Sequence, residues 1–234
     1  MRKVRGLGLA ALLLFVSIAV EAQEVIIKAD VVNQYIWRGQ DLGHVSLQST
    51  LSFNYKGLSL TAWGSVGLSD AQDTEEFDLT LAYSIKGLNI GITDYWFSKG
   101  LDPEGRYFKY DAHGTNHVFE ANIGYDFGLA TIQWFTNFTG NDGTNKDDKR
   151  AYSSYLEVAM PFKFIKADWI ATVGVVPFAT TLYGTSGFAV TNLSLRATKD
   201  IKVTETFTIP IFGQITSNPC AQKAYLVFGI TLQP

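Results

Sequence analysis

The chain has 234 residues, of which 14% are aromatic and 18% charged, and it contains one cysteine. A formal net charge of −3 argues against nucleic acid as a partner. A single cysteine excludes an internal disulfide.

Residues 1–22 have the composition of a secretory signal peptide. Arg2, Lys3 and Arg5 precede an apolar run over residues 7–20, and a small-residue cleavage site ends at Ala22. This run is too short to span a bilayer comfortably as a helix, and no later run of about 20 apolar residues occurs. We therefore predict an exported domain of residues 23–234, either soluble outside the inner membrane or forming a barrel in an outer one.

The mature region reads as twelve strands. The stretch 47–92 contains the same unit twice, an alternating run, a Lys-Gly pair and a second alternating run, with the pairs at Lys56-Gly57 and Lys86-Gly87. A two-residue break containing Gly is typical of a tight β-hairpin. The predicted strands cover residues 25–38, 47–55, 58–68, 77–85, 88–97, 117–125, 129–137, 151–160, 167–176, 188–198, 203–216 and 224–232.

Short turns and long polar loops alternate between these predicted strands. The longest loop covers residues 98–116, whereas residues 161–166 and 199–202 are predicted to be short turns. Such alternation is typical of an all-β, transmembrane, antiparallel up-and-down barrel with short periplasmic turns and longer extracellular loops.

Alternation along the strands gives each one an apolar and a polar face. Leu60, Leu79 and Ile230 belong to the apolar face, and their neighbours Thr61 and Thr80 to the polar one. In a soluble sandwich the apolar face would lie inside, and in a membrane barrel it faces lipid. Alternation does not decide between these two folds.

Aromatic residues gather near the predicted strand ends, as in the belts of membrane barrels. Tyr55 and Tyr83 lie near short turns, and Tyr35 and Trp37 near a long loop. Ordinary core and loop packing is the alternative explanation. Asp94 occupies an outward position of its strand, where the alternation would place an apolar residue. We therefore predict a bulge there, or a position already at the water–lipid interface.

Charged residues on the polar face are candidates for lining the lumen. They are Lys28, Asp30, Arg38, Asp78, Glu120, Glu157, Asp168 and Arg196. Five acids against three bases predict a mildly negative lumen, with a weak cation preference if it conducts. Structural pairing across the barrel is the alternative, and twelve strands do not by themselves establish an open channel.

In the longest loop, Tyr107, Phe108 and Tyr110 are candidates for a ligand platform, for gating the lumen by folding inward, or for packing onto the rim. Catalysis is not predicted, because His44, His113 and His117 all lie in or beside loops and no Gly-x-Ser-x-Gly elbow occurs. The sequence indicates no metal site and no cofactor.

The segment 33–40, with Tyr35, Arg38 and Gly39, resembles the Tyr-x-x-Arg-Gly step of the TorF-type porin family of conserved hypothetical bacterial outer-membrane proteins. Repeated alternating hairpins extend the resemblance over most of the mature chain. It implies a barrel in the cell outer membrane and says little about cargo. After Gly39 this chain has Gln40, where the family often continues with Ile-Ser-Gln.

Two functions remain open from the sequence. The first is a narrow porin that passes small polar solutes by passive diffusion. The second is a non-conducting structural or surface-binding barrel that acts through its outer loops or within a larger outer-membrane complex. Outer-membrane lipid is the expected surrounding in both, and the oligomeric state is left open.

Overall fold

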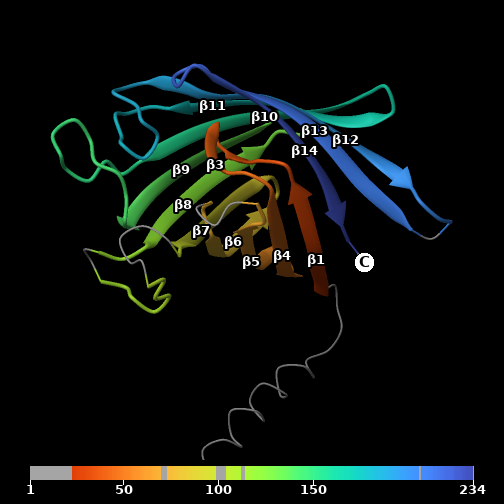
Figure 1. Cartoon of the computed structure of the whole chain (residues 1–234), viewed down its shortest axis with the longest axis horizontal. Coiled ribbons are helices and arrows are strands. Elements are labelled where there is room, and N and C mark those ends of the chain that lie inside the picture. Colours follow the sequence, from red (N-terminus) through yellow and green to blue (C-terminus); the bar gives the residue numbers. More distant parts are fainter. Residues whose placement is uncertain (1–22, 70–72, 99–103, 112–113, 206, 234) are drawn as a thin grey trace, which may run out of the picture.

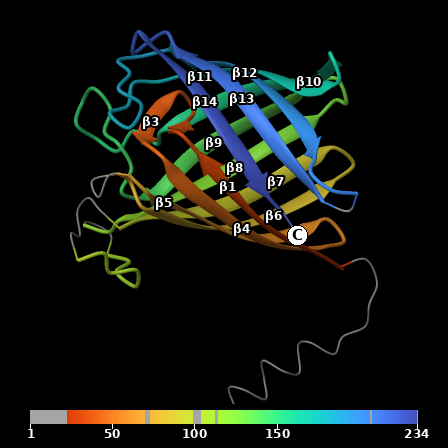
Figure 2. The same cartoon turned by 45° about the vertical axis from the view of Figure 1, so that its right-hand side comes forward.

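The structure, a computed structural model, describes residues 23–69, 73–98, 104–111, 114–205 and 207–233. Within these residues, twelve long antiparallel strands close into one barrel, in which β14 returns to pair with β1 (Figures 1 and 2). The barrel strands are β1 (Gln23–Val32), β4 (Ser46–Tyr55), β5 (Leu58–Gly67), β6 (Glu76–Ile85), β7 (Leu88–Phe97), β8 (His117–Asp126), β9 (Thr131–Gly140), β10 (Ser154–Phe164), β11 (Ala167–Val176), β12 (Ala189–Lys202), β13 (Thr208–Asn218) and β14 (Lys223–Leu232). The predicted twelve-stranded all-β barrel is confirmed.

The predicted signal peptide lies outside the described residues. Among the residues that the structure does describe, no helix is long and apolar enough to cross a membrane.

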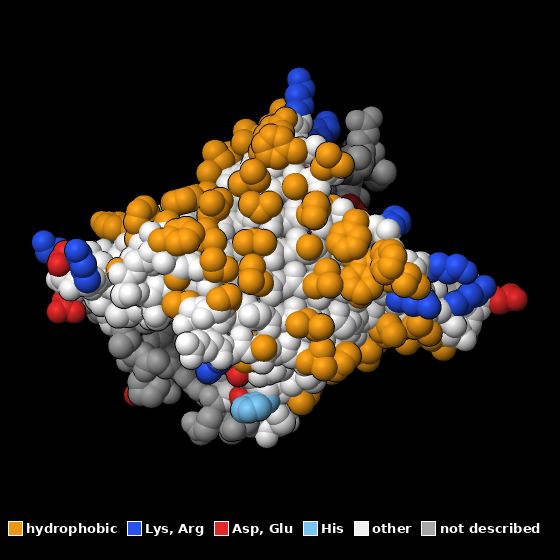
Figure 3. Space-filling view, turned by 90° about the horizontal axis from the view of Figure 1, so that it is seen from above, with side chains coloured by type: hydrophobic (Ala, Val, Ile, Leu, Met, Phe, Trp, Pro, Cys, Tyr) orange, Lys and Arg blue, Asp and Glu red, His pale blue; other side chains and the backbone are white. Residues whose placement is uncertain are grey.

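The outer wall of the barrel is apolar. Leu60 is 53% exposed, and Leu79 and Ile230 are exposed as well, while Thr61 and Thr80 point inward and are half-buried. Figure 3 shows apolar side chains spread over the wall in view, with charged side chains mainly around its edges. The polar face therefore lines the interior.

Tight turns at one end of the barrel follow the predicted chemistry. Lys56-Gly57 and Lys86-Gly87 both have positive φ at each residue, as in the turns that match the twist of paired strands. Gly57 also lies close to a neighbouring strand, because a Cβ there would meet the carbonyl oxygen of Ser84 at 2.4 Å. Ile165-Lys166 makes the same turn without glycine, at φ of 47° and 55°.

Strand extends into two predicted turns, over residues 161–164 of the first and all of residues 199–202 in the second. β10 continues through Pro161, whose missing N–H costs nothing because pairing with β9 stops at Ala159. Lys199 to Lys202 extend β12, where Ile201 pairs with Ile209 and continues the apolar face. At the other end, the last long loop shrinks to residues 219–222, because β13 and β14 extend beyond their predicted ends.

The predicted first strand is also wrong in its second half. β1 ends at Val32, and at Asn33 a last backbone bond to β14, from the Asn33 N–H to the Phe228 carbonyl at 3.0 Å, is joined by two side-chain bonds. The Asn33 Nδ2 donates to the Leu226 carbonyl at 3.1 Å, and its Oδ1 accepts the Phe228 N–H at 2.6 Å. The main chain is thereby free to leave the wall, and it forms the separate hairpin of β2 (Tyr35–Trp37) and β3 (Gln40–Gly43).

Replacing Ile165-Lys166 by Asn-Gly should stabilise the barrel. A β-branched residue at positive φ is strained by roughly 1 kcal/mol or more, and Asn-Gly adopts this turn without that strain. We expect a higher urea midpoint for the variant refolded into lipid vesicles, followed by tryptophan fluorescence. An equal or lower midpoint would contradict the assigned turn.

Candidate functional site: a hairpin inside the barrel

The β2–β3 hairpin lies inside the ring of strands, at the end that carries the long loops (Figures 1 and 2). The Tyr35 hydroxyl donates to Glu76 on β6 at 2.9 Å. Arg38, in the hairpin turn, reaches Glu120 on β8, and the Gly39 carbonyl accepts the Asn218 side-chain amide of β13 at 3.0 Å. The hairpin is therefore held to several walls of the barrel at once.

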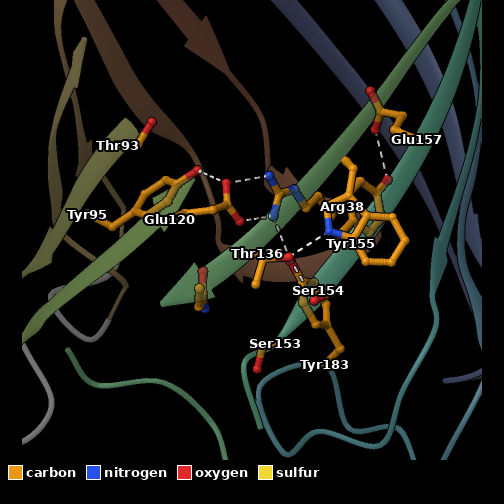
Figure 4. A network of polar contacts seen from close by, with 12 residues as sticks. Arg38, Thr93, Tyr95, Glu120, Thr136, Ser153, Ser154, Tyr155, Glu157 and Tyr183 are labelled. Atoms are coloured by element: carbon orange, nitrogen blue, oxygen red, sulfur yellow. Dashed lines mark hydrogen bonds and ion pairs between the residues drawn. The ribbon is translucent and has the colours of Figure 1, made fainter. Parts of the chain in front are cut away.

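The Arg38 guanidinium is the central contact (Figure 4). Its side chain is 8% exposed, and its two terminal nitrogens donate to the two oxygens of Glu120 at 2.6 and 2.8 Å. It also donates to the Tyr183 hydroxyl at 2.7 Å, and Tyr95 donates to Glu120 at 2.9 Å. A planar guanidinium suits this paired geometry, and every charge in the cluster has a partner.

Aromatic rings enclose the same cation. Its Cζ lies 4.4 Å from the centre of the Trp37 ring, 4.1 Å from Phe135 and 4.7 Å from Tyr155. Tyr183 comes from the loop of residues 177–188 and stacks between Trp37 and Tyr155. Burial raises the pKa of the Tyr183 hydroxyl to about 12, although the neighbouring Arg38 acts to lower it. Tyr183 therefore stays neutral at pH 7.

The turn of the hairpin tolerates only glycine at its second position. Arg38 and Gly39 have φ of 50° and 80°, the same pattern as the Lys-Gly turns. A Cβ on Gly39 would lie 1.8 Å from the Thr191 carbonyl oxygen of β12. The hairpin tip thus rests directly on the barrel backbone.

An apolar patch supports the base of the hairpin. Ile36 packs on Val32, Phe212 and Val227, which are buried on the inner wall. The Arg196 guanidinium lies 3.5 Å from the centre of the Phe212 ring. This patch adds apolar burial where the hairpin leaves the wall.

The remaining predicted lumen residues are spread along the interior. Lys28 and Asp30 form a loose pair at 3.8 Å, and Glu157 accepts the Tyr155 hydroxyl at 2.8 Å. Asp78 is buried next to Glu76 on the inward face of β6. Asp168 lies at the short-turn end, exposed and paired with Lys163 at 3.0 Å. The structure thus brings Arg38 and Glu120 together but leaves Asp168 at the rim.

The two halves of the lumen differ. The loop-end half holds the hairpin, and Glu76, Asn137 and Asn192 are buried there. In the turn-end half, inward side chains such as Asn54 and Ser84 are half-buried or exposed. The interior is therefore accessible from the short turns and narrowed by the hairpin towards the long loops.

The aromatic residues predicted for loop gating lie on the outer wall. The Tyr107 ring packs edge-on against outward-facing Phe77 and Trp96, Tyr110 stacks on His117, and Phe108 is 87% exposed. Of the three alternatives left open by the sequence, this placement corresponds to packing at the rim. Residues 99–103 and 112–113, including His113, lie outside the described residues.

His117 holds this loop in place. Its ring, fully buried, contacts the Asp94 carboxylate at 2.7 Å and the Tyr107 carbonyl at 2.6 Å. No register shift occurs at Asp94, so of the two predicted alternatives the bulge is wrong, and the loop covers this outward carboxylate. The register shift lies one strand further on, between Phe119 and Glu120.

Several functional contacts were missed from the sequence. Tyr35 and Trp37 were predicted for an outer belt and instead face the interior, and Glu76 and Tyr183 were not singled out. The Arg38-Gly39 pair repeats the pattern of the Lys-Gly turns, and this was the signal in the sequence that could have indicated a hairpin turn here. Among the residues described, no group of three His, Cys, Asp or Glu side chains could hold a metal ion.

Comparisons with known proteins give distant structural likenesses. No family model and no curated protein matches the chain, so the resemblance to TorF-type porins stays a prediction. A Rhodopseudomonas blastica porin mutant aligns at 13% identity and a TM-score of 0.39, over 81% of this chain and 55% of that porin, so this chain spans little more than half of that porin's length. An outer membrane channel from Pseudomonas putida F1 aligns at 13% identity and a TM-score of 0.40, over 90% of this chain and 96% of the channel. Salmonella typhi OmpF aligns at 10% identity and a TM-score of 0.36, over 91% of this chain and 97% of OmpF.

Breaking the central ion pair should destabilise the barrel strongly. Arg38→Met leaves the buried Glu120 charge without its partner, which costs about 3–5 kcal/mol of unfolding free energy. The double variant Arg38→Met/Glu120→Leu should recover much of this loss. Urea unfolding in lipid vesicles measures both.

The matched control for this series is Asp168→Asn. Its ion pair with Lys163 is exposed, so its loss should change the unfolding free energy by about 1 kcal/mol or less. Equal losses for the buried and the exposed pair would argue against Arg38 as the anchor of the hairpin.

Proposed function

We propose that this chain is an outer-membrane β-barrel that forms a narrow passage for small polar solutes, with the β2–β3 hairpin as its constriction. The observation that carries the proposal is the division of the wall, with exposed Leu60 and Ile230 outside and polar Thr61 and Thr80 inside. An apolar outer wall is favourable in lipid, and a polar lumen can hold water.

Passive diffusion suits the accessible polar half of the lumen. Asn54, Asn89 and Asn122 line it with side-chain amides, and solutes would enter from the short turns. The hairpin then restricts the path towards the long loops. Lys28, Asp30, Glu157 and Arg196 would set the charge of this passage, as the sequence predicts.

A non-conducting barrel is the second candidate. The bidentate contact between Arg38 and Glu120, together with the Gly39 contact to Asn218, favours it because these bonds hold the hairpin firmly in the lumen. Such a barrel would act through its outer loops or as part of a larger outer-membrane complex.

The proposed orientation can be tested with the native cysteine. Cys220 is exposed in the connection 219–222, on the long-loop side, so a membrane-impermeant maleimide should label it on intact cells. In the control variant Cys220→Ser/Leu129→Cys, the thiol moves to the opposite, short-turn end and should react only after the outer membrane is opened. The reverse pattern would invert the assigned orientation.

Planar-bilayer recordings distinguish the two functions. We expect small conductance steps from the unaltered chain and steps several times larger when residues 34–43 are replaced by a short Gly-Ser link. In a potassium chloride gradient the reversal potential should show a weak cation preference, because acids outnumber bases in the lumen. A silent unaltered chain would support the non-conducting barrel instead.

A further inference from the structure

Two carboxyl groups stand side by side where the hairpin meets β6. Glu76 and Asp78 are two residues apart and point into the lumen, and they are 6% and 8% exposed. Trp63 of β5 lies directly opposite Asp78, and its ring packs on Tyr35 at 5.6 Å. The carboxyls are thus enclosed by β5, β6 and the hairpin.

The negative charge of this pair has no basic partner. Arg38 is committed to Glu120, and within the described part of the chain no ion pair reaches Glu76 or Asp78. Tyr35 donates a hydrogen bond to Glu76, but a neutral hydroxyl supplies no charge. The two carboxyls lie close together on one buried face of β6. Two buried carboxylates need either protons or a cation.

Two further oxygen atoms at this place have unused bonding capacity. The Ser65 hydroxyl is fully buried and, among the described residues, makes no hydrogen bond, and neither does Oδ1 of Asp78. Ser65 lies directly opposite Glu76 in the β5–β6 ladder, on the same inward face, where side chains approach each other closely. An unpartnered buried hydroxyl is costly unless it has a ligand.

We propose that Glu76, Asp78 and Ser65 form a binding site for a hard divalent cation of the calcium class. Carboxylate and hydroxyl oxygens are the ligands such ions take, and Ca²⁺ accepts irregular geometry with water completing its shell. Its charge matches the two carboxylates. Two carboxylates rather than three make the site a weak one.

This inference deepens the proposed function and rests on it for its role. A weakly held cation beside the constriction neutralises the acidic pair and gives a divalent ion a place to pause on the way through the lumen. Binding itself does not require conduction, so it can be measured separately.

Terbium luminescence tests the site in the mature chain refolded into detergent micelles. Tb³⁺ replaces Ca²⁺ at oxygen sites and is excited through nearby indole rings, so Trp63 should sensitise a saturable emission that Ca²⁺ displaces. Glu76→Gln/Asp78→Asn should weaken Tb³⁺ binding at least tenfold, and Ser65→Ala several-fold.

The control is Asp168→Asn, which removes an exposed carboxylate at the other end of the lumen and should leave Tb³⁺ binding unchanged. Absence of saturable emission from the unaltered chain, or equal binding by the Glu76→Gln/Asp78→Asn variant, would overturn the site. Conductance of the same preparations distinguishes the two ideas, because a conducting chain without Tb³⁺ binding keeps the passage and loses the cation site.

Discussion

Closure of the backbone ladder is the constraint on which the structure depends. An apolar outer wall offers no partners for N–H and C=O groups, so each strand must bond to a neighbour on both sides, and β1 must meet β14. In the closed barrel every second side chain of a strand points outward, so apolar and polar residues alternate along each strand with a period of two. With Leu and Ile outside, Thr, Asn and Asp are left to line the interior.

A polar interior of twelve strands creates a second problem, because wall side chains fill a barrel of eight strands but not a wider one. This chain fills the loop-end half with its own hairpin. Since the inward wall there is largely polar, attachment is mainly by charge, hydrogen bonding and ring stacking. The Arg38 pair with Glu120 and the stacked rings of Trp37 and Tyr183 provide it. The small apolar patch around Phe212 supports only the base.

Local signals predicted most of the wall. The Lys56-Gly57 turn and the alternation of residues such as Leu60 and Thr61 are readable because neighbouring residues determine them. The hairpin was missed because Tyr35-Ile36-Trp37 continues the alternation of β1, so that Arg38-Gly39 looks like the end of a strand. Its inward position depends on Glu120 and Tyr183, which are far away in the sequence.

Contacts between residues far apart in the sequence also decide where the long loop packs. Aromatic residues at Tyr107 and Tyr110 indicate that the loop packs against something, but they do not say which side of the wall receives it. His117 decides this by facing outward on β8, and the alternation of β8 would have placed it there. Asp94 gave a related signal, since an outward carboxylate needs a cover.

The junction between β1 and β14 has a consequence for how the molecule is put together. Four residue pairs join these strands, against ten between β1 and β4. Asn33 extends that short seam with its side chain and is also the point where the chain turns inward. The same asparagine therefore takes part in pairing β1 with β14 and in directing the hairpin into the lumen. Closure of the barrel and filling of its lumen are coupled through this residue.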